Sequence, residues 1–239
     1  MIETTGLADP APVAQTFFVD EEVKANYELD AIITLVDAKH VTQHLDEEKL
    51  GGAENEAVEQ VAFADKILLN KIDLVTAEEK AAVVAKLRGI NQFAELIETQ
   101  QSAVDLDRIL GIKAFDLNRV LQVEEDFLDT AEHTHDESVS SVGFDFEGAL
   151  DLAKLNTWLT ALLRERGVDI FRSKGVLNVA GSEARYIFQG VHMLMSISSS
   201  DDGVGRPWKD GEPRTSRLVF IGRNLNREEI RASFSQCKV

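Results

Sequence analysis

The 239-residue sequence predicts an α/β fold in its first half and a smaller α+β unit in its second. Strand-like apolar runs alternate with helical patterns up to about residue 110, which is typical of a parallel sheet. Beyond about residue 140, strand-like runs follow one another between two helices. The charge changes at the same place: residues 1–140 carry 30 acidic and 11 basic side chains (net −19), and residues 141–239 carry 12 and 14 (net +2). We therefore expect two domains joined near residue 140.

The composition excludes several classes of protein. Hydrophobic residues make up 44% and charged residues 28% of the chain, as in ordinary globular proteins. No apolar run approaches the roughly 20 residues of a membrane span, and no targeting segment is visible, so we expect a cytoplasmic protein without membrane contact, with an organelle left open. The acidic first half would repel phosphates, which argues against nucleic-acid binding. The single Cys237 excludes an intrachain disulfide framework.

The first residues combine a carboxylate and a glycine in a way that suits a nucleotide site. We expect a strand that ends at Glu3 and a turn at Gly6. Glu3 would hold a Mg²⁺-bound water, and the Gly6 N–H would approach a γ-phosphate with no Cβ in the way. An ordinary turn is the alternative. Pro10 and Pro12 then open a short helix over 13–18.

Strands and helices alternate through the rest of the first half. The run 31–36 predicts a strand that ends at Asp37, whose carboxylate either approaches a nucleotide or caps the next turn. Thr76 and Glu79 form a capping box, which predicts a helix that ends at Gly89. The other expected elements are a helix over 55–64, a buried strand over 66–69, a short strand over 96–98 and a small helix over 106–110.

The most informative short motif follows the strand over 66–69. Asn70, Lys71 and Asp73 form an N-K-x-D pattern, at the strand end where open α/β sheets bind ligands. The Asp73 carboxylate can accept hydrogen bonds from guanine N1–H and the exocyclic amine, a donor pair that adenine lacks. The Lys71 stem can lie along the base or ribose, and the Asn70 amide can serve the base or brace the loop. A polar turn is the alternative.

Histidines could supply a metal site in two places. His133 and His135 lie in the acidic stretch 117–141, which we expect to be a linker, and two imidazoles beside carboxylates could hold Zn²⁺. A solvated linker with incidental histidines is the preferred interpretation. His40 and His44 are four residues apart, and we expect exposed polar positions there rather than metal ligands.

The second half is expected to form a compact α+β domain over 142–239. A helix with Leu155 and Leu159 on its apolar face ends at Gly167. His192 is expected to be half buried within a strand. The other expected elements are strands over 142–146, 175–179, 185–196 and 217–221, and a last helix that begins near residue 226.

Together these motifs resemble the CobW-type G3E GTPases. The resemblance covers essentially the whole chain, and the joint spacing of the motifs is far more specific than N-K-x-D alone. The motifs are E-T-T-G-L-A-D-P at 3–10, V-D-A-K-H at 36–40, N-E-A at 55–57, Q-V-A-F-A-D at 60–65, L-N-K-I-D-L at 69–74, F-R-S-K-G at 171–175, F-Q-G-V-H-M at 188–193 and G-E-P-R-T-S-R at 211–217.

The resemblance implies a partial P-loop-GTPase-like domain over 1–116, an acidic linker over 117–141 and a CobW C-terminal-like domain over 142–239. It implies GTP and Mg²⁺ as ligands, and delivery of a metal, zinc above all, to a client metalloprotein. Under this resemblance Glu3 and Gly6 act in hydrolysis. The residues that would choose guanine are Asn70, Lys71 and Asp73.

The chain departs from the family pattern in two motifs. The family's P-loop, G-x-x-G-x-G-K-[ST], and its Cys-x-Cys-Cys metal motif do not occur in these 239 residues. A start at an internal methionine, or a short gene model, explains this more easily than an evolved form without a P-loop. Two functions stay open: a GTP-hydrolysing metallochaperone, and a non-hydrolysing partner-binding or regulatory module that keeps the guanine pocket and the C-terminal domain.

Overall fold

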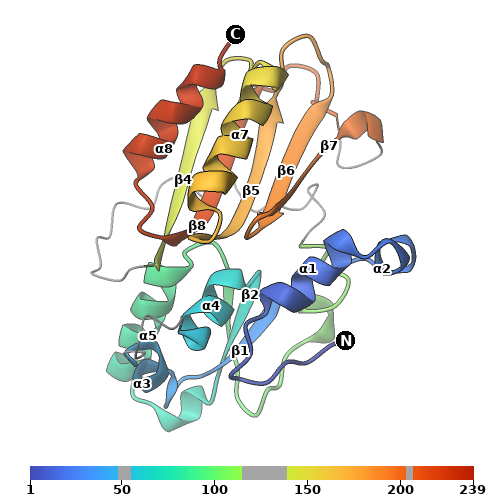
Figure 1. Cartoon of the computed structure of the whole chain (residues 1–239). Coiled ribbons are helices and arrows are strands. Elements are labelled where there is room, and N and C mark those ends of the chain that lie inside the picture. The colour runs from blue at the N-terminus through green and yellow to red at the C-terminus, as the bar shows by residue number, and fades with distance from the viewer. Residues whose placement is uncertain (48–54, 115–138, 203–206) are drawn as a thin grey trace. The chain divides into compact units, whose positions relative to one another are not determined.

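A computed structural model of the chain describes residues 1–47, 55–114, 139–202 and 207–239. Contacts divide the chain into two compact units, each with its own sheet (Figure 1). None of the helices in these ranges is long and apolar enough to cross a membrane. Nearly all of the expected linker over 117–141, with His133 and His135, lies outside the described residues.

The first unit is built on a parallel sheet with the strand order β1-β2-β3. Asp37 pairs with Asn70 and Leu69 with Glu98, so the carboxyl ends of the three strands meet at one edge. The central strand is buried from residue 67 to residue 70, because both of its faces are covered. The strands are β1 (Ile33–Asp37), β2 (Lys66–Asn70) and β3 (Glu95–Glu98).

Helices α4 and α5 of the first unit begin at side-chain caps. Asn55 accepts from two N–H groups at the start of α4. The predicted capping box is complete, because the Thr76 hydroxyl accepts from Glu79 N–H and the Glu79 carboxylate accepts from Thr76 N–H. The helices are α1 (Ala11–Val19), α2 (Glu21–Asn26), α3 (Val41–Leu45), α4 (Glu56–Phe63) and α5 (Ala77–Ile90), with 3₁₀ turns η2 (Ile72–Leu74) and η3 (Leu106–Arg108).

One expectation for the first unit is wrong. Residues 1–5 form no strand, and Ile2 is 64% exposed. A strand needs a neighbour for its backbone N–H and C=O groups, and no described strand pairs with this segment. The small helix expected over 106–110 is a single 3₁₀ turn, Leu106–Arg108.

The second unit is a five-stranded sheet in the order β4-β8-β5-β6-β7, with α7 and α8 side by side against one face (Figure 1). The rings of Phe144, Phe146 and Trp158 meet Phe234 edge-on, at centroid distances of 5.1–5.7 Å. The elements are β4 (Val139–Glu147), α7 (Leu152–Arg166), β5 (Ile170–Asn178), β6 (Arg185–Val191), β7 (Leu194–Ser199), η5 (Ser200–Asp202), β8 (Thr215–Arg223), α8 (Arg227–Phe234) and η6 (Ser235–Cys237).

The single strand expected over 185–196 is wrong, because the structure has a hairpin there. Val191 pairs with Leu194, and His192 takes a left-handed φ of 49° in the turn between β6 and β7. The alternation of apolar and polar residues runs straight through a tight turn that carries no glycine or asparagine, so it gave no sign of a reversal. His192 is half buried as expected, with its ring edge-on to Phe171 at 5.4 Å.

Candidate functional site

Asn70 lies at the carboxyl edge of the first sheet and is almost fully buried, with 6% exposure. Its Oδ1 accepts from Ser102 N–H at 2.9 Å and from the Thr99 hydroxyl at 3.2 Å. Its Nδ2 donates to the Ser102 hydroxyl at 3.0 Å. Of the two roles that the sequence left open for this amide, the geometry supports the brace: Asn70 holds the loop that follows β3.

Lys71, the next residue, adopts the left-handed conformation with φ 62° and ψ 31°. Such a conformation is disfavoured for a residue with a Cβ, and it persists only where its surroundings impose it. Lys71 C=O accepts from Leu74 N–H at 3.0 Å. Lys71 Nζ donates to Asp37 Oδ2 at 2.6 Å, which links the ends of β1 and β2.

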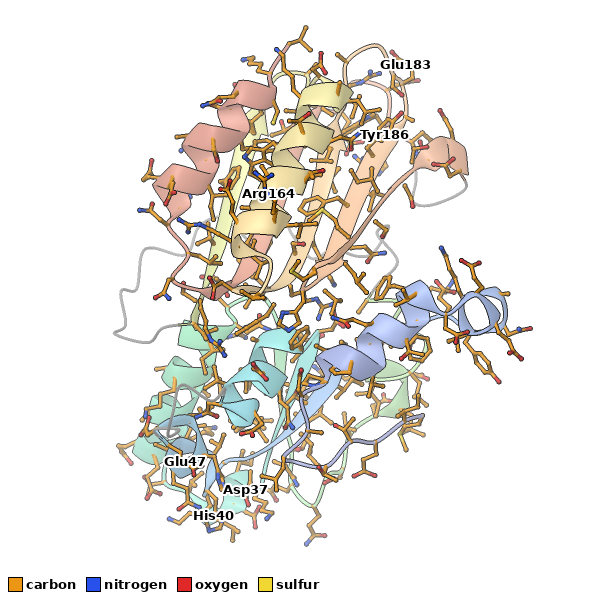
Figure 2. The ribbon with its side chains drawn as sticks, viewed as in Figure 1. Asp37, His40, Glu47, Arg164, Glu183 and Tyr186 are labelled. Carbon is orange, nitrogen blue, oxygen red and sulfur yellow. The ribbon has the colours of Figure 1, made fainter. Side chains whose placement is uncertain are left out.

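Asp37 gathers three donors around one carboxylate. Besides Lys71, His40 Nδ1 lies 3.0 Å from Asp37 Oδ2, and Lys39 N–H donates to Oδ1 at 2.8 Å (Figure 2). Burial on its own raises the pKa of Asp37. The hydrogen bonds from Lys71, His40 and Lys39 outweigh that effect and hold the pKa well below its usual range. The carboxylate is therefore ionised at every physiological pH.

Asp73 lies in the middle of η2, and its side chain is exposed. Within the described residues, no hydrogen bond or ion pair occupies its carboxylate. The 3₁₀ turn presents this free acceptor beside Lys71, at the edge where β1, β2 and β3 end. A carboxylate with unused lone pairs in that place can accept the two donors of a guanine edge.

The segment around Glu3 and Gly6 is held by a different element, α4. Gln60 Nε2 donates to the carbonyl oxygens of Thr5 at 3.2 Å and Ala8 at 2.8 Å. Glu3 itself is exposed, and a Cβ placed at Gly6 would meet no atom within 4 Å. The structure thus brings Asn70, Lys71 and Asp73 together, whereas no hydrogen bond joins Glu3 or Gly6 to them.

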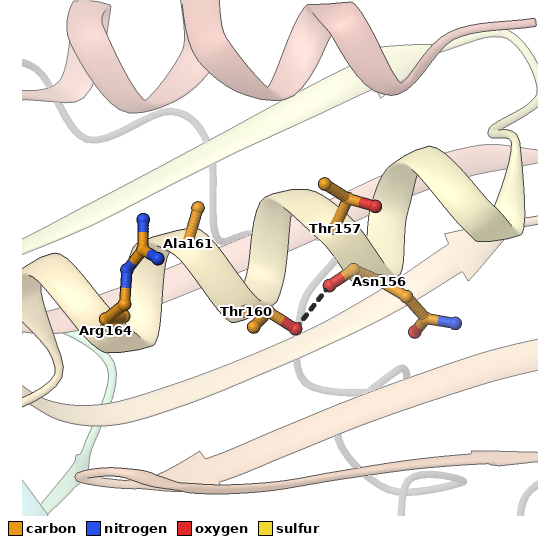
Figure 3. A pocket seen from close by; sticks show the side chains of 5 residues that line it. All are labelled: Asn156, Thr157, Thr160, Ala161 and Arg164. Atoms are coloured by element: carbon orange, nitrogen blue, oxygen red, sulfur yellow. Dashed lines mark hydrogen bonds between the residues drawn. The ribbon is translucent and has the colours of Figure 1, made fainter.

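Among the described residues, no group of three or more His, Cys, Asp or Glu side chains is placed to hold a metal ion. His40 is engaged with Asp37, and His133 and His135 lie outside the described ranges. A hollow along the outer side of α7 is lined by Asn156, Thr157, Thr160, Ala161 and Arg164 (Figure 3). The Thr160 hydroxyl donates to the Asn156 carbonyl, and all five lining residues belong to this one helix.

Sequence reasoning missed two parts of this arrangement. The first is Ser102, which follows Gln101 in a turn where both residues have positive φ, 50° and 56°; neither residue type signals that conformation. The second is Gln60, whose side chain holds a segment more than fifty positions earlier. The sequence indicated that Asp37 is a carboxylate at a strand end, but it did not indicate that Lys71 is its ion-pair partner.

Comparison with protein families matches both parts of the chain. Residues 1–98 match the model described as CobW/HypB/UreG, nucleotide-binding domain. Residues 139–238 match the model described as cobalamin synthesis protein cobW C-terminal domain.

Individual proteins show the same similarity. The chain is 34% identical to zinc chaperone YjiA of Escherichia coli, over 98% of this chain and 69% of that protein. It is 30% identical to zinc-regulated GTPase metalloprotein activator 1 of Schizosaccharomyces pombe, over 95% and 61%. It is 29% identical to zinc chaperone CobW of Pseudomonas aeruginosa, over 96% and 64%. The chain thus spans about 60 to 70% of the length of these relatives.

A crystal structure supports the fold. The Zn(II)-bound YjiA GTPase from E. coli superimposes with a TM-score of 0.78 at 33% identity, over 98% of this chain and 69% of that one. The predicted fold class, a parallel α/β sheet followed by a smaller α+β unit, is confirmed.

Proposed function

Because the chain belongs to the CobW family, we propose that it is a GTP-binding metallochaperone that delivers zinc to a client metalloprotein. The relatives named as zinc chaperones and as a GTPase metalloprotein activator support this role. The observation that carries it here is the Asp73 carboxylate, exposed and without a partner in the described part of the chain, beside a loop braced by Asn70. We further propose a cytoplasmic location and a division into 1–116, 117–141 and 142–239.

Each residue of the N-K-x-D pattern has its own task in this proposal. Asp73 accepts the N1–H and exocyclic amine of guanine, so adenine, which lacks both donors, leaves the carboxylate unpaired. Lys71 lays its apolar stem along the base or ribose. Asn70 keeps the loop after β3 in place.

Mg²⁺ would accompany the triphosphate, and Glu3 and Gly6 are the residues of this chain proposed to face it. They do not complete a phosphate site, because the family's pattern of backbone donors with a lysine and a hydroxyl, G-x-x-G-x-G-K-[ST], does not occur in these 239 residues. No hydrolytic step is therefore assigned to the residues present. Zinc is the cargo, and His133 and His135 are proposed as a weak and dispensable contact for it.

The test is base selectivity, measured by NMR titration of residues 1–239 with GTP, ATP and xanthosine triphosphate. GTP should bind best, and Asp73→Asn should weaken GTP by about ten- to a hundredfold, since charge-assisted hydrogen bonds contribute roughly 1.5–3 kcal/mol each. Xanthosine triphosphate should gain relative to GTP, because the amide offers a donor to its 2-carbonyl. Unchanged GTP affinity in Asp73→Asn would mean that the N-K-x-D pattern is an ordinary turn.

Asp107→Asn is the matched control. Asp107 also lies in the middle of an exposed 3₁₀ turn of the first unit, and its carboxylate has no partner among the described residues. This variant makes the same chemical change at a site away from the N-K-x-D pattern, so it should bind GTP as the wild type does.

The second candidate function is a non-hydrolysing module that binds guanine nucleotide and partners. The observation in its favour is that these 239 residues contain no G-x-x-G-x-G-K-[ST] pattern. Phosphate release by residues 1–239 with Mg²⁺ tests the second function. We expect release far slower than the ~1 s⁻¹ that marks the low end of ordinary enzymes, and turnover near that rate would exclude the second function.

A further inference from the structure

We propose that Asp37 is a positioning residue for guanine recognition, which holds the Lys71 side chain in place before the base arrives. The inference rests on the proposed function, because it assigns a new residue to the same site. Asp37 contacts no base itself and acts only through Lys71.

Asp37 and Lys71 are connected both through the backbone pairing of their strand ends and through a side-chain contact. Asp37 pairs with Asn70 in the register of β1 and β2, and Ala38 N–H donates to Asn70 C=O at 2.9 Å, so the two strand ends are fixed to each other. On that frame Asp37 Oδ2 accepts from Lys71 Nζ at 2.6 Å.

The Asp37 carboxylate is itself held in place. Lys39 N–H fixes its Oδ1 at 2.8 Å, and His40 Nδ1 shares its Oδ2 at 3.0 Å (Figure 2). The Asp37 side chain is 28% exposed, whereas the Lys71 side chain is 48% exposed. The less exposed and better anchored partner is therefore the one that fixes the other.

A lysine on the surface needs such a partner if its stem is to line a binding site. A free lysine side chain samples many rotamers, and ordering it when the ligand binds costs conformational entropy. An ion pair formed in the free protein removes part of that cost beforehand, which is how preorganisation raises affinity. The left-handed backbone of Lys71 fixes the direction of its Cα–Cβ bond, and Asp37 fixes the far end of the side chain.

Electrostatics alone predicts the opposite effect of Asp37 removal on nucleotide affinity. A nucleotide is an anion, so removal of a nearby carboxylate should strengthen its binding through charge. If Asp37 positions Lys71, its removal weakens binding instead. The sign of the change therefore separates a positioning role from a background charge.

The experiment is a double-mutant cycle on residues 1–239, with the Kd of GDP measured by NMR titration. Asp37→Asn should weaken GDP binding by about three- to fivefold, the range expected for one well-placed exposed ion pair. Lys71→Met keeps the apolar stem and removes the ammonium group, so it should weaken binding by a similar factor. In the Lys71→Met background, Asp37→Asn should no longer weaken GDP binding, because the ammonium group that Asp37 holds is already gone.

Two further variants complete the experiment: one is an alternative to Asp37→Asn, and the other is a control. Asp37→Ser keeps a side-chain acceptor for Lys39 N–H but loses the carboxylate, so it gives the same answer if Asp37→Asn folds poorly. Asp107→Asn, whose carboxylate lies away from the N-K-x-D pattern, is the control and should leave GDP affinity within about twofold of wild type.

Unchanged or tighter GDP binding by Asp37→Asn and Asp37→Ser would overturn the inference, as would additive effects of Asp37→Asn and Lys71→Met. Asp73→Asn, titrated alongside, tells the two proposals apart. If it weakens GDP binding while the Asp37 variants do not, only the positioning role fails. If Asp73→Asn also binds as the wild type does, the guanine site itself is wrong and both proposals fail.

Discussion

Asn70 and Ser102 bond to each other in both directions: the amide Nδ2 of Asn70 donates to the Ser102 hydroxyl at 3.0 Å, and Ser102 N–H donates to Asn70 Oδ1 at 2.9 Å. The pair is 32 residues apart in sequence. It joins the end of β2 to a turn in which Gln101 and Ser102 both have positive φ. The buried Asn70 at the end of β2 thus holds a strained loop. A substitution of Asn70 should disturb that loop more than the rest of the first unit.

Asn70→Ala should therefore lower both stability and guanine-nucleotide affinity. It leaves the buried Thr99 hydroxyl without its acceptor, and an unsatisfied buried polar group costs about 1–3 kcal/mol. Hydrogen exchange should show that the variant increases the exchange rate more in residues 99–103 than elsewhere in the first unit. Asn91→Ala is the matched control: Asn91 is also buried, but it ties the end of α5 to the end of α4. It should destabilise the unit and leave the loop's relative protection unchanged; equal effects from both variants would contradict the bracing role.

The first unit should lose stability in acid, in part through Asp37. Its pKa is depressed in the folded protein from an ordinary value of 3.8, so its contribution is complete above about pH 4 and is lost as the pH falls below that value. Urea unfolding of the first unit, followed by NMR between about pH 6 and pH 2.5, should therefore show a shallower acid dependence for Asp37→Asn. Asp107→Asn should keep the wild-type dependence, and identical curves for all three proteins would refute the prediction.

Cys237 should be unreactive until the second unit opens. The thiol is 1% exposed, and burial raises its pKa to about 11, so almost no thiolate is present at neutral pH. Phe234→Ala removes a buried ring from the same core and should destabilise the unit by about 3–5 kcal/mol. Labelling by a thiol reagent should then be at least about a hundredfold faster. Arg231→Ala, an exposed change on the same helix, should label at the wild-type rate, and fast labelling of the wild type would contradict the buried assignment.

Zinc should bind weakly to the isolated chain. Two imidazoles at 133 and 135 do not complete a tetrahedral site, and the described residues supply no ready-made cluster of three ligands. Calorimetric titration of Zn²⁺ should give a weak isotherm that differs little between wild type and the His133→Ala/His135→Ala double variant. Tight one-to-one binding that disappears in the double variant would show that this segment is a real site.

The sequence alone determined the features that depend on neighbours along the chain. The capping box of Thr76 and Glu79 spans one helical turn, and both halves form as expected. The buried run over 66–69 fixed the central strand, and the N-K-x-D pattern directly after it marked the candidate site. The family resemblance came from the spacing of such local motifs, and the comparisons confirm it.

Only the tertiary structure decided which distant groups meet. Lys71 finds Asp37 across 34 positions, and Asn70 finds Ser102 across 32, because parallel pairing brings the strand ends to one edge. The tertiary structure also decided that the chain turns at His192 and that no strand forms at Ile2. A strand exists only where a second strand takes up its backbone hydrogen bonds, and the pattern of one segment does not reveal whether that partner is in place.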